Sequence, residues 1–321
     1  MDSVVSSRRA PAPGWLVWVC LWIVYLVWGS TYLAIRVTVE TLPPLFGMGV
    51  RFVVAGTLMY GWLFFRKGRD GMAVSRRQLV SCALVGAALL FGGNGMVAVA
   101  EQNVTSSLAA LILGAIPLWV VVLRKLSGDR ISWGTLAGVG AGFTGVAVLV
   151  VPRGASGGTQ ALAVGLMLVA SLSWASGSFA SGRLELPQNP FVSTSIQMIL
   201  GGAVLLIAGA LRGELVSLNA ASFSRASLLA LVYLIFVGSL LAFTAYTWLL
   251  QNAPLSKVST YAYVNPVVAV FLGWSLLSEE ITLGTLGGAV VIVASVAFIV
   301  RHESTPQPDR PRPLELAAER R

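Results

Sequence analysis

The sequence predicts an all-α membrane protein whose ten transmembrane helices form two inverted five-helix repeats around a central cavity. The first observation is composition: the 321 residues are 56% apolar and 11% charged, with a mean hydropathy of +0.81. A soluble domain carries about 25% charged residues. The second observation is that ten apolar stretches reach the roughly 20 residues that a spanning helix needs. The third is an internal repeat that divides these stretches five and five.

The ten apolar stretches follow one another with short connections, so little folded material is expected outside the bilayer. Gly, Pro or charged residues bound most of the stretches, which cover about 15–35, 45–65, 78–100, 104–123, 131–151, 161–182, 190–211, 226–250, 255–277 and 281–300. The expected organisation is a cytoplasmic N-terminal tail over 1–14, a first repeat over 15–151, a second, inverted repeat over 160–300, and a cytoplasmic tail over 302–321. This last tail is rich in Pro, Arg and Glu, which predicts disorder.

The distribution of Lys and Arg predicts the topology. With the N-terminus inside, seventeen of the 22 basic residues fall in cytoplasmic segments and four in outer segments, as the positive-inside rule requires. Arg8 and Arg9 precede an apolar run without a cleavage site, so the first helix is expected to be a signal anchor. We therefore expect a multi-pass protein of the bacterial cytoplasmic (inner) membrane with both termini cytoplasmic. The net charge of +9 then needs no nucleic-acid partner.

The internal repeat is visible in short motifs. Gly134-Thr-Leu-Ala-Gly138 matches Gly284-Thr-Leu-Gly-Gly288, and Trp28-Gly-Ser30 answers Trp174-Ala-Ser176. Because each unit has five spans, an odd number, the second copy must enter the membrane upside down. Inverted repeats of this kind are common in secondary transporters, whose substrate site lies near the midplane between the halves. The glycine spacing itself indicates close helix packing, and a monomer or a weak homodimer is expected.

A proline lies within a spanning stretch in each half, at Pro117 and Pro266. Each follows a Gln-Asn pair at the same spacing. Pro266 frees the backbone carbonyl of Ala262, which lipid cannot satisfy, so this helix should face protein or a water-filled cavity. One interpretation is a pair of kinks lining a central cavity, with Tyr261, Tyr263 and Asn265 offered to a ligand. The alternative is a pair of structural kinks packed against neighbours.

Other polar side chains within the stretches allow two interpretations each. Asn94, in Gly92-Gly-Asn-Gly-Met96, either binds substrate or ties two helices together. The side chains of Trp28, Ser30, Trp174 and Ser176 either line the same pocket or mark ordinary packing.

Arg51 is the one basic residue within a span. It either extends its side chain outward to the interface or pairs with Glu101, the nearest acid on the outer side, at the mouth of the cavity. No acid lies deep in any stretch, so an obvious proton relay is missing. Glu101 and the Glu279-Glu280 pair are peripheral candidates only.

The chain carries no pattern of catalytic or metal-binding chemistry. Cys20 and Cys82 both lie in apolar stretches, and His302 is the single histidine, so no metal site, disulfide framework or cofactor is expected. A membrane-embedded enzyme acting on lipid would need a nucleophile with a base, or metal ligands, at depth. The expected protein is not an enzyme. Its expected partners are a small-molecule solute and the lipid bilayer.

Several motifs together resemble the EamA-type transporters of the drug/metabolite transporter superfamily, and among them the YedA-like exporters. They are Trp28-Gly-Ser-Thr-Tyr32, Arg51-Phe52, Gly93-Asn-Gly-Met96, Glu101-Gln-Asn103, Trp174-Ala-Ser-Gly-Ser178 and Ser259-Thr-Tyr-Ala-Tyr-Val-Asn-Pro-Val-Val268. The resemblance covers about residues 15–300. It implies ten helices in two inverted repeats and outward movement of small organic solutes such as amino acids, metabolites or drugs. The family carries no fixed catalytic set.

We therefore expect a secondary active transporter that exports small amphipathic metabolites by alternating access, the alternative being a passive facilitator or channel. Aromatic faces would enclose apolar or cationic parts of the solute, and amides and hydroxyls would donate and accept hydrogen bonds. The expected substrate-binding residues are Trp28, Ser30, Asn94, Trp174, Ser176, Tyr261, Tyr263 and Asn265.

Overall fold

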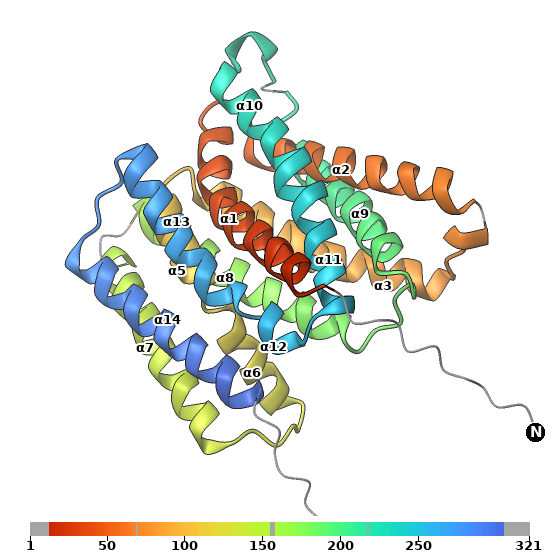
Figure 1. Ribbon diagram of the computed structural model, residues 1–321. Coiled ribbons are helices and arrows are strands. Elements are labelled where there is room, and N and C mark those ends of the chain that lie inside the picture. Colours follow the sequence, from red (N-terminus) through yellow and green to blue (C-terminus); the bar gives the residue numbers. More distant parts are fainter. Residues whose placement is uncertain (1–12, 69, 155–157, 217, 305–321) are drawn as a thin grey trace, which may run out of the picture.

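The computed structural model describes residues 13–304, apart from 69, 155–157 and 217, and the regular elements of these residues are all helical (Figure 1). The first half contains α1 Gly14–Thr38, α2 Pro44–Lys67, η1 Asp70–Met72, α3 Arg76–Gly86, η2 Ala87–Gly95, α4 Met96–Ala100, α5 Ser106–Leu113, α6 Ile116–Leu126 and α7 Trp133–Gly154. The second half contains α8 Gly158–Ser181, α9 Pro190–Leu211, η3 Ala220–Ser222, α10 Arg225–Tyr233, η4 Leu234–Leu241, α11 Ala242–Asn252, α12 Leu255–Val258, α13 Tyr261–Leu277 and α14 Leu283–Ser304.

Nine helical runs within the described residues are long and apolar enough to cross a membrane. The stretch expected over 255–277 differs, because its helix is interrupted. A short α12 ends at Val258, and α13 starts at Tyr261 with 17 residues, the lower limit of the spanning range. The tails predicted over 1–14 and 302–321 lie mostly outside the described residues, which leave out 1–12 and 305–321. Helix α14 continues through Ser304.

Two long runs change to π-helix in the middle. The run from α3 to α4 contains η2, and the run from α10 to α11 contains η4. A π segment leaves the regular i to i−4 pattern of hydrogen bonds and is often found at functional sites. These two runs occupy the third and eighth places in the order of helical runs, so the irregularity recurs once in each half.

The predicted kink at Pro117 is a full break in the helix. Helix α5 ends at Leu113, and α6 starts at Ile116 with Pro117 in its first turn. A proline is well tolerated there, because its missing N–H would have no intrahelical partner. Pro266 instead lies inside the continuous helix α13.

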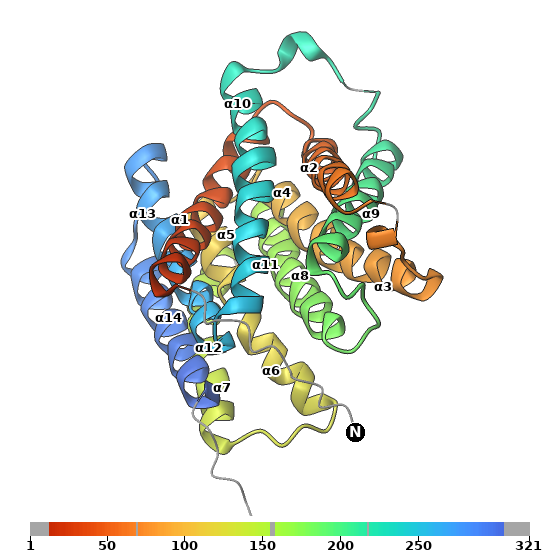
Figure 2. The same ribbon diagram turned by 45° about the vertical axis from the view of Figure 1, so that its right-hand side comes forward.

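The two halves interdigitate rather than lying side by side (Figures 1 and 2). Helix α2 packs along α9, α7 packs along α14, and α5 packs against α13. Helix α1 contacts α11 and α13 of the second half, while α8 contacts η2 and α6 of the first. Helices α1, α2, α5, α7, α8, α9, α13 and α14 therefore each pack against helices of the other half.

Small residues bring these pairs close together. An added Cβ at Gly86 of α3 would lie 2.5 Å from the backbone oxygen of Gln197, and one at Gly201 would lie 2.6 Å from the backbone oxygen of Gly86. On α14, a Cβ at Gly288 would lie 3.1 Å from the backbone oxygen of Gly145 on α7. Glycine at helix crossings in membranes permits this approach of two backbones.

Helix starts are capped by the same chemistry in both halves. The Ser75 and Ser224 side chains accept the N–H of the third residue of α3 and α10, respectively. Ser132 does the same for Thr135 at α7, and Thr282 does so for Thr285 at α14. These caps satisfy donors that a helix start would otherwise leave without partners.

One end of the bundle, named here the Glu101 end, is formed by the connections 39–43, 101–105, 212–224 and 278–282. They are tied together: Arg36 donates to the backbone oxygen of Glu101, and the Ser224 N–H donates to the Thr41 hydroxyl. At the opposite end, Arg183 lies 3.8 Å from Asp129, so the connections 127–132 and 182–189 meet there.

We predict that Gly86→Ala destabilises the protein by about 1–3 kcal/mol, because the new methyl group meets backbone that cannot move aside. The measurement is thermal unfolding of the purified protein in detergent. The matched control is Gly165→Ala, since a Cβ at that α8 position has no neighbour within 4 Å and alanine is the better helix former. Equal unfolding temperatures for the two variants would contradict the close packing of α3 on α9.

Candidate solute-binding cavity

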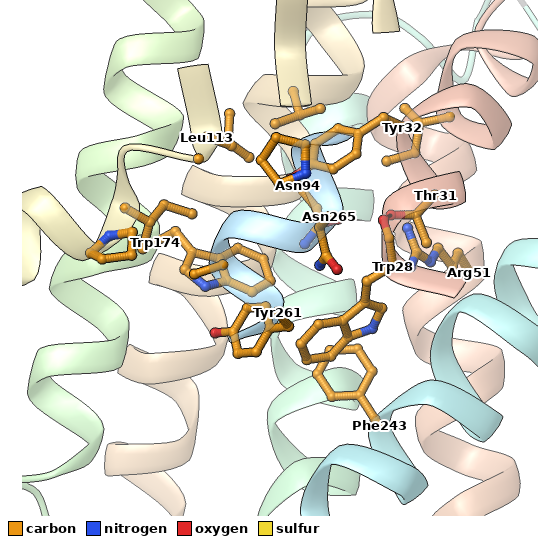
Figure 3. Close-up of a pocket in the computed structure, with 17 residues that line it drawn as sticks. Trp28, Thr31, Tyr32, Arg51, Asn94, Leu113, Trp174, Phe243, Tyr261 and Asn265 are labelled. Carbon is orange, nitrogen blue, oxygen red and sulfur yellow. Dashed lines mark hydrogen bonds between the residues drawn. The ribbon is translucent and has the colours of Figure 1, made fainter. Parts of the chain in front are cut away.

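A partly enclosed cavity lies between the two halves, about midway along α1, at the α5–α6 break and beside the first two turns of α13 (Figure 3). Its volume is ≈ 90 Å³, several times the roughly 10–15 Å³ that one water molecule needs. The lining comes from seven helical runs of both halves and consists of Trp28, Thr31, Tyr32, Ile35, Arg51, Asn94, Val97, Leu113, Gly114, Ile116, Pro117, Trp174, Phe243, Tyr261, Ala262, Asn265 and Pro266. A small solute would therefore contact both halves at once.

An aromatic cluster forms one wall of the cavity. The Trp28 ring lies 5.3 Å from the Phe243 ring and 5.3 Å from the Tyr261 ring, measured between centroids, both in edge-to-face arrangements. Tyr246 completes the cluster at 4.9 Å from Trp28. Figure 3 shows Trp28, Phe243 and Tyr261 together on one side of the cavity, with Trp174 beside Tyr261. These rings offer apolar faces to a ligand and can also attract a cation.

Two asparagine side chains stand among these apolar groups. Asn265 on α13 is buried, and its carbonyl oxygen Oδ1 has no hydrogen-bond partner. Asn94, in η2, donates from Nδ2 to the backbone oxygen of Leu89 at 3.5 Å, which is a weak bond at best. A buried polar atom without a partner costs about 1–3 kcal/mol. The Asn265 amide is thus placed to gain from a ligand that donates a hydrogen bond.

Arg51 contributes a positive charge to the lining. It is 2% exposed, its Nε donates to the Ser239 hydroxyl at 3.0 Å, and its Nη1 lies 3.8 Å from the Met48 sulfur. The guanidinium carbon is 4.5 Å from the Phe52 ring centroid. Within the described residues the guanidinium contacts no carboxylate. Since arginine carries five N–H donors, several remain available on the cavity side for an anionic group.

The sequence-predicted residues divide between two locations. Trp28, Asn94, Trp174, Tyr261 and Asn265 line the cavity, as do Arg51, Pro117 and Pro266. Ser30, Ser176 and Tyr263 lie off the lining. The Ser30 hydroxyl donates to the backbone oxygen of Val27 and also hydrogen-bonds the Tyr233 hydroxyl, and Ser176 donates to the backbone oxygen of Leu172. The Tyr263 side chain packs half-buried against the hydrophobic core.

Three further polar or aromatic lining residues were not among the predicted site residues: Thr31, Tyr32 and Phe243. Thr31 and Tyr32 belong to the Trp28-Gly-Ser-Thr-Tyr32 motif, so the sequence did point to this segment. It did not show which side chains of the motif face the cavity, because that depends on the neighbouring helices. Phe243 is the second residue of α11, after η4, and the sequence gives an apolar residue there no mark that separates it from ordinary packing residues.

The predicted ion pair between Arg51 and Glu101 is absent. Glu101 is 0% exposed, and neither of its carboxylate oxygens has a hydrogen-bond partner. Its nearest cation is Arg36, whose Nη1 donates to the Glu101 backbone oxygen at 2.7 Å. Arg51 therefore belongs to the cavity, and Glu101 belongs to the end of the bundle above it.

At the Glu101 end, the Glu279 carboxylate of the second half caps the start of α5 in the first half. Glu279, after α13, accepts the Ser106 N–H at 2.8 Å, the Ser106 hydroxyl at 2.9 Å and the Ser107 N–H at 3.0 Å; it also accepts the Ser107 hydroxyl. These are the first residues of α5, where free N–H groups and the helix dipole favour a negative charge. The contact holds α13 and α5 together on one side of the cavity.

A second carboxylate does the same for α2. Glu214, after α9, accepts the Phe46 N–H at 2.8 Å and the Leu45 N–H at 3.4 Å. Helix α2 begins with Pro44 and has no side-chain cap of its own, so Glu214 supplies the acceptor from the other half. Both carboxylate caps lie at the Glu101 end and both join the two halves.

Comparison with known proteins gives the context for this geometry. The model of the EamA-like transporter family matches the chain twice, over residues 15–151 and 161–301. The "Uncharacterized inner membrane transporter YedA" of Escherichia coli (strain K12) is 38% identical over 280 residues, which cover 85% of this chain and 89% of the relative. The "Uncharacterized transporter YoaV" of Bacillus subtilis (strain 168) is 24% identical over 275 residues, which cover 85% and 92%.

A solved crystal structure shares the fold. It superposes with a TM-score of 0.62 over 91% of this chain and 99% of its own length, at 18% identity. The two matches of the family model together cover most of the 321 residues, and the similarity to YedA extends over nearly the whole helical region. The chain therefore belongs to the EamA-like transporter family.

Proposed function

We propose that this protein is a secondary active transporter of the bacterial cytoplasmic membrane, which exports small organic metabolites bearing a carboxylate, such as amino acids, by alternating access. The observation that carries the proposal is the cavity shared by both halves, in which the Arg51 guanidinium contacts no described carboxylate and the Asn265 oxygen has no partner. Membership of a transporter family supports movement of a solute, and the cavity chemistry suggests which kind.

The charge of Arg51 argues for an anionic group on the solute. A buried guanidinium is costly unless an anion compensates its charge, and its planar N–H groups match the two oxygens of a carboxylate. An ammonium group on the same solute would find the Asn265 oxygen and the faces of Trp28 and Tyr261. Both ends of an amino acid would then have partners in one cavity.

Alternating access would follow from two inverted repeats. The family model matches each half once, the π segments and the serine or threonine caps recur in both halves, and long helices of one half pack against those of the other, as α2 does on α9 and α7 on α14. Rocking of one half against the other would open the cavity at either end in turn. On the topology expected from Lys and Arg, the Glu101 end is the outer end, and Glu279 holds it closed.

We predict that Asn265→Ala and Tyr261→Ala each lose most transport, because each removes a group that contacts the solute in the cavity. The measurement is uptake or counterflow of labelled amino acids in proteoliposomes, with protein amounts matched. The control is Ser176→Ala, whose hydroxyl donates within its own helix, away from the lining. Unchanged transport in the first two variants would remove them from the site. Solute accumulation against its gradient separates the proposed transporter from a passive facilitator.

We predict that Arg51→Gln weakens binding of carboxylate solutes about tenfold to a hundredfold, the effect of losing one charged hydrogen bond worth roughly 1.5–3 kcal/mol. Trp28 and Trp174 line the cavity, so quenching of tryptophan fluorescence reports binding. Each amino acid is compared with the primary amine that lacks its carboxylate. An equal loss for acid and amine would mean that Arg51 is structural.

We predict that Glu279→Ala opens the Glu101 end, because it removes four acceptor contacts from the start of α5. The reporter is Val97→Cys on the cavity lining, in a chain whose buried Cys20 and Cys82 are replaced by alanine. Labelling by a membrane-impermeant thiol reagent added outside should become several-fold faster. Glu280→Ala, which removes an exposed neighbouring carboxylate, should leave the rate unchanged; faster labelling in both variants would contradict the specific contact.

A further inference from the structure

Glu101 is a buried acid that the solute cavity does not use. It follows the last residue of α4, it is 0% exposed, and both of its carboxylate oxygens lack a hydrogen-bond partner. An ionised carboxylate in such a place has lost its hydration without gaining donors, which is far more costly than burying the neutral acid. The geometry therefore favours the protonated form of Glu101 in this conformation.

The charged and titratable neighbours of Glu101 come from two elements. Helix α1 contributes Arg36, which donates to the backbone oxygen of Glu101 and not to its carboxylate, and the Tyr32 hydroxyl within electrostatic range. The connection after α13 contributes Glu279, whose oxygens are occupied by the start of α5. Burial first, and the Glu279 charge second, raise the pKa of Glu101 well above its ordinary range, while Arg36 lowers it in part.

Glu101 has neighbours on the linings of two spaces. A hollow of ≈ 450 Å³ at the Glu101 end is lined by Arg36 and Gln102, which flank Glu101, and by Ser107, which donates to Glu279. On the other side, Tyr32 lines the central cavity. Release of Glu279 from α5 would admit water from the hollow to Glu101, and opening of the opposite end would admit water through the cavity.

We propose that the Glu101 carboxyl is the proton-binding site that couples solute movement to the proton gradient. When the Glu101 end closes, the carboxylate takes one proton from water at that end and becomes neutral. It gives the proton back to water that reaches it, either from the same end when that end reopens or through the cavity when the opposite end is open. The proposal rests on the proposed transport function and adds to it the coupling ion.

The sign of the pH dependence follows from the direction of the shift. A carboxyl whose pKa is raised on closure stabilises the closed end below that pKa, and this contribution is lost as the pH rises through it. Between the ordinary and the raised pKa, the ratio of closed to open protein should fall by up to about tenfold per pH unit. Glu101→Gln, which stays neutral, should abolish this dependence.

The first test is an infrared titration of the purified protein, which needs no solute. The carbonyl stretch of a protonated carboxyl should persist well above the ordinary carboxyl range in the unmodified protein and in the control Glu280→Gln, and it should disappear in Glu101→Gln. A band that titrates in the ordinary carboxyl range, near pH 4.3, or that survives in Glu101→Gln, would overturn the proposal.

Two neighbouring substitutions keep the test decisive if Glu101→Gln fails to fold. Arg36→Gln removes a positive charge and should move the titration to higher pH, whereas Glu279→Gln removes a negative charge and should move it to lower pH. Absence of either shift would argue against Glu101 as the titrating group.

A conformational test separates this proposal from the transport proposal. Outside labelling of Val97→Cys should accelerate as the pH rises, and should become independent of pH when Glu101→Gln is added. If transport fails in proteoliposomes while these titrations hold, the proton site stands and the solute assignment is wrong. If labelling does not depend on pH while solute is still transported, the proton site is wrong and transport stands.

Discussion

The structure depends on one constraint: a polar group surrounded by apolar side chains and lipid must find a partner inside the protein. Six helix starts obey it, by serine or threonine caps at α3, α7, α10 and α14 and by the carboxylates of Glu214 and Glu279 at α2 and α5. Arg51, Asn265 and Glu101 are the exceptions on which the proposals about function rest. Each is buried, and each lacks either a compensating charge or a hydrogen-bond partner in the part of the chain that the structure describes. Unmet polar groups of this kind are expected at functional sites rather than at random positions.

The interruptions of the helices obey the same constraint. The α5–α6 break places Gly114 and Pro117 on the cavity lining, and Pro266 lies on it from inside α13. The π segment η2 carries Asn94 to the cavity. An irregular backbone at membrane depth is tolerated only where protein or a water-filled space surrounds it. The α5–α6 break, the η2 segment and Pro266 therefore meet at one place, where the backbone cannot face lipid, and this supports proposing that place as the binding site.

Much of this arrangement could be predicted from the sequence, because the sequence shows how deep in the membrane each residue lies. Stretches of apolar residues fix the spans, and a proline or an amide near the middle of a span indicates the side of the helix that faces a cavity. The direction of a side chain around the helix axis is harder, since successive residues differ by about 100°. Trp28 faces the cavity while Ser30, two positions later, bonds elsewhere. The Arg51–Glu101 prediction failed for a related reason: sequence gives depth but not distance within the membrane plane.

The two ends of the bundle differ in a way that the repeat alone does not require. The Glu101 end is joined by two carboxylates, Glu214 and Glu279, packed against helix starts, whereas the opposite end is joined by the exposed ion pair of Asp129 with Arg183. An exposed ion pair is worth little because water screens it, so opening that end costs little. Opening the Glu101 end instead would separate Glu214 and Glu279 from their hydrogen-bond donors and expose the buried Glu101 carboxyl to water. On the proposed mechanism, a transporter with unequal ends needs an input that favours the costlier opening. Ionisation of the proposed proton site at Glu101 would provide one, because the charge that it creates is stable only in water.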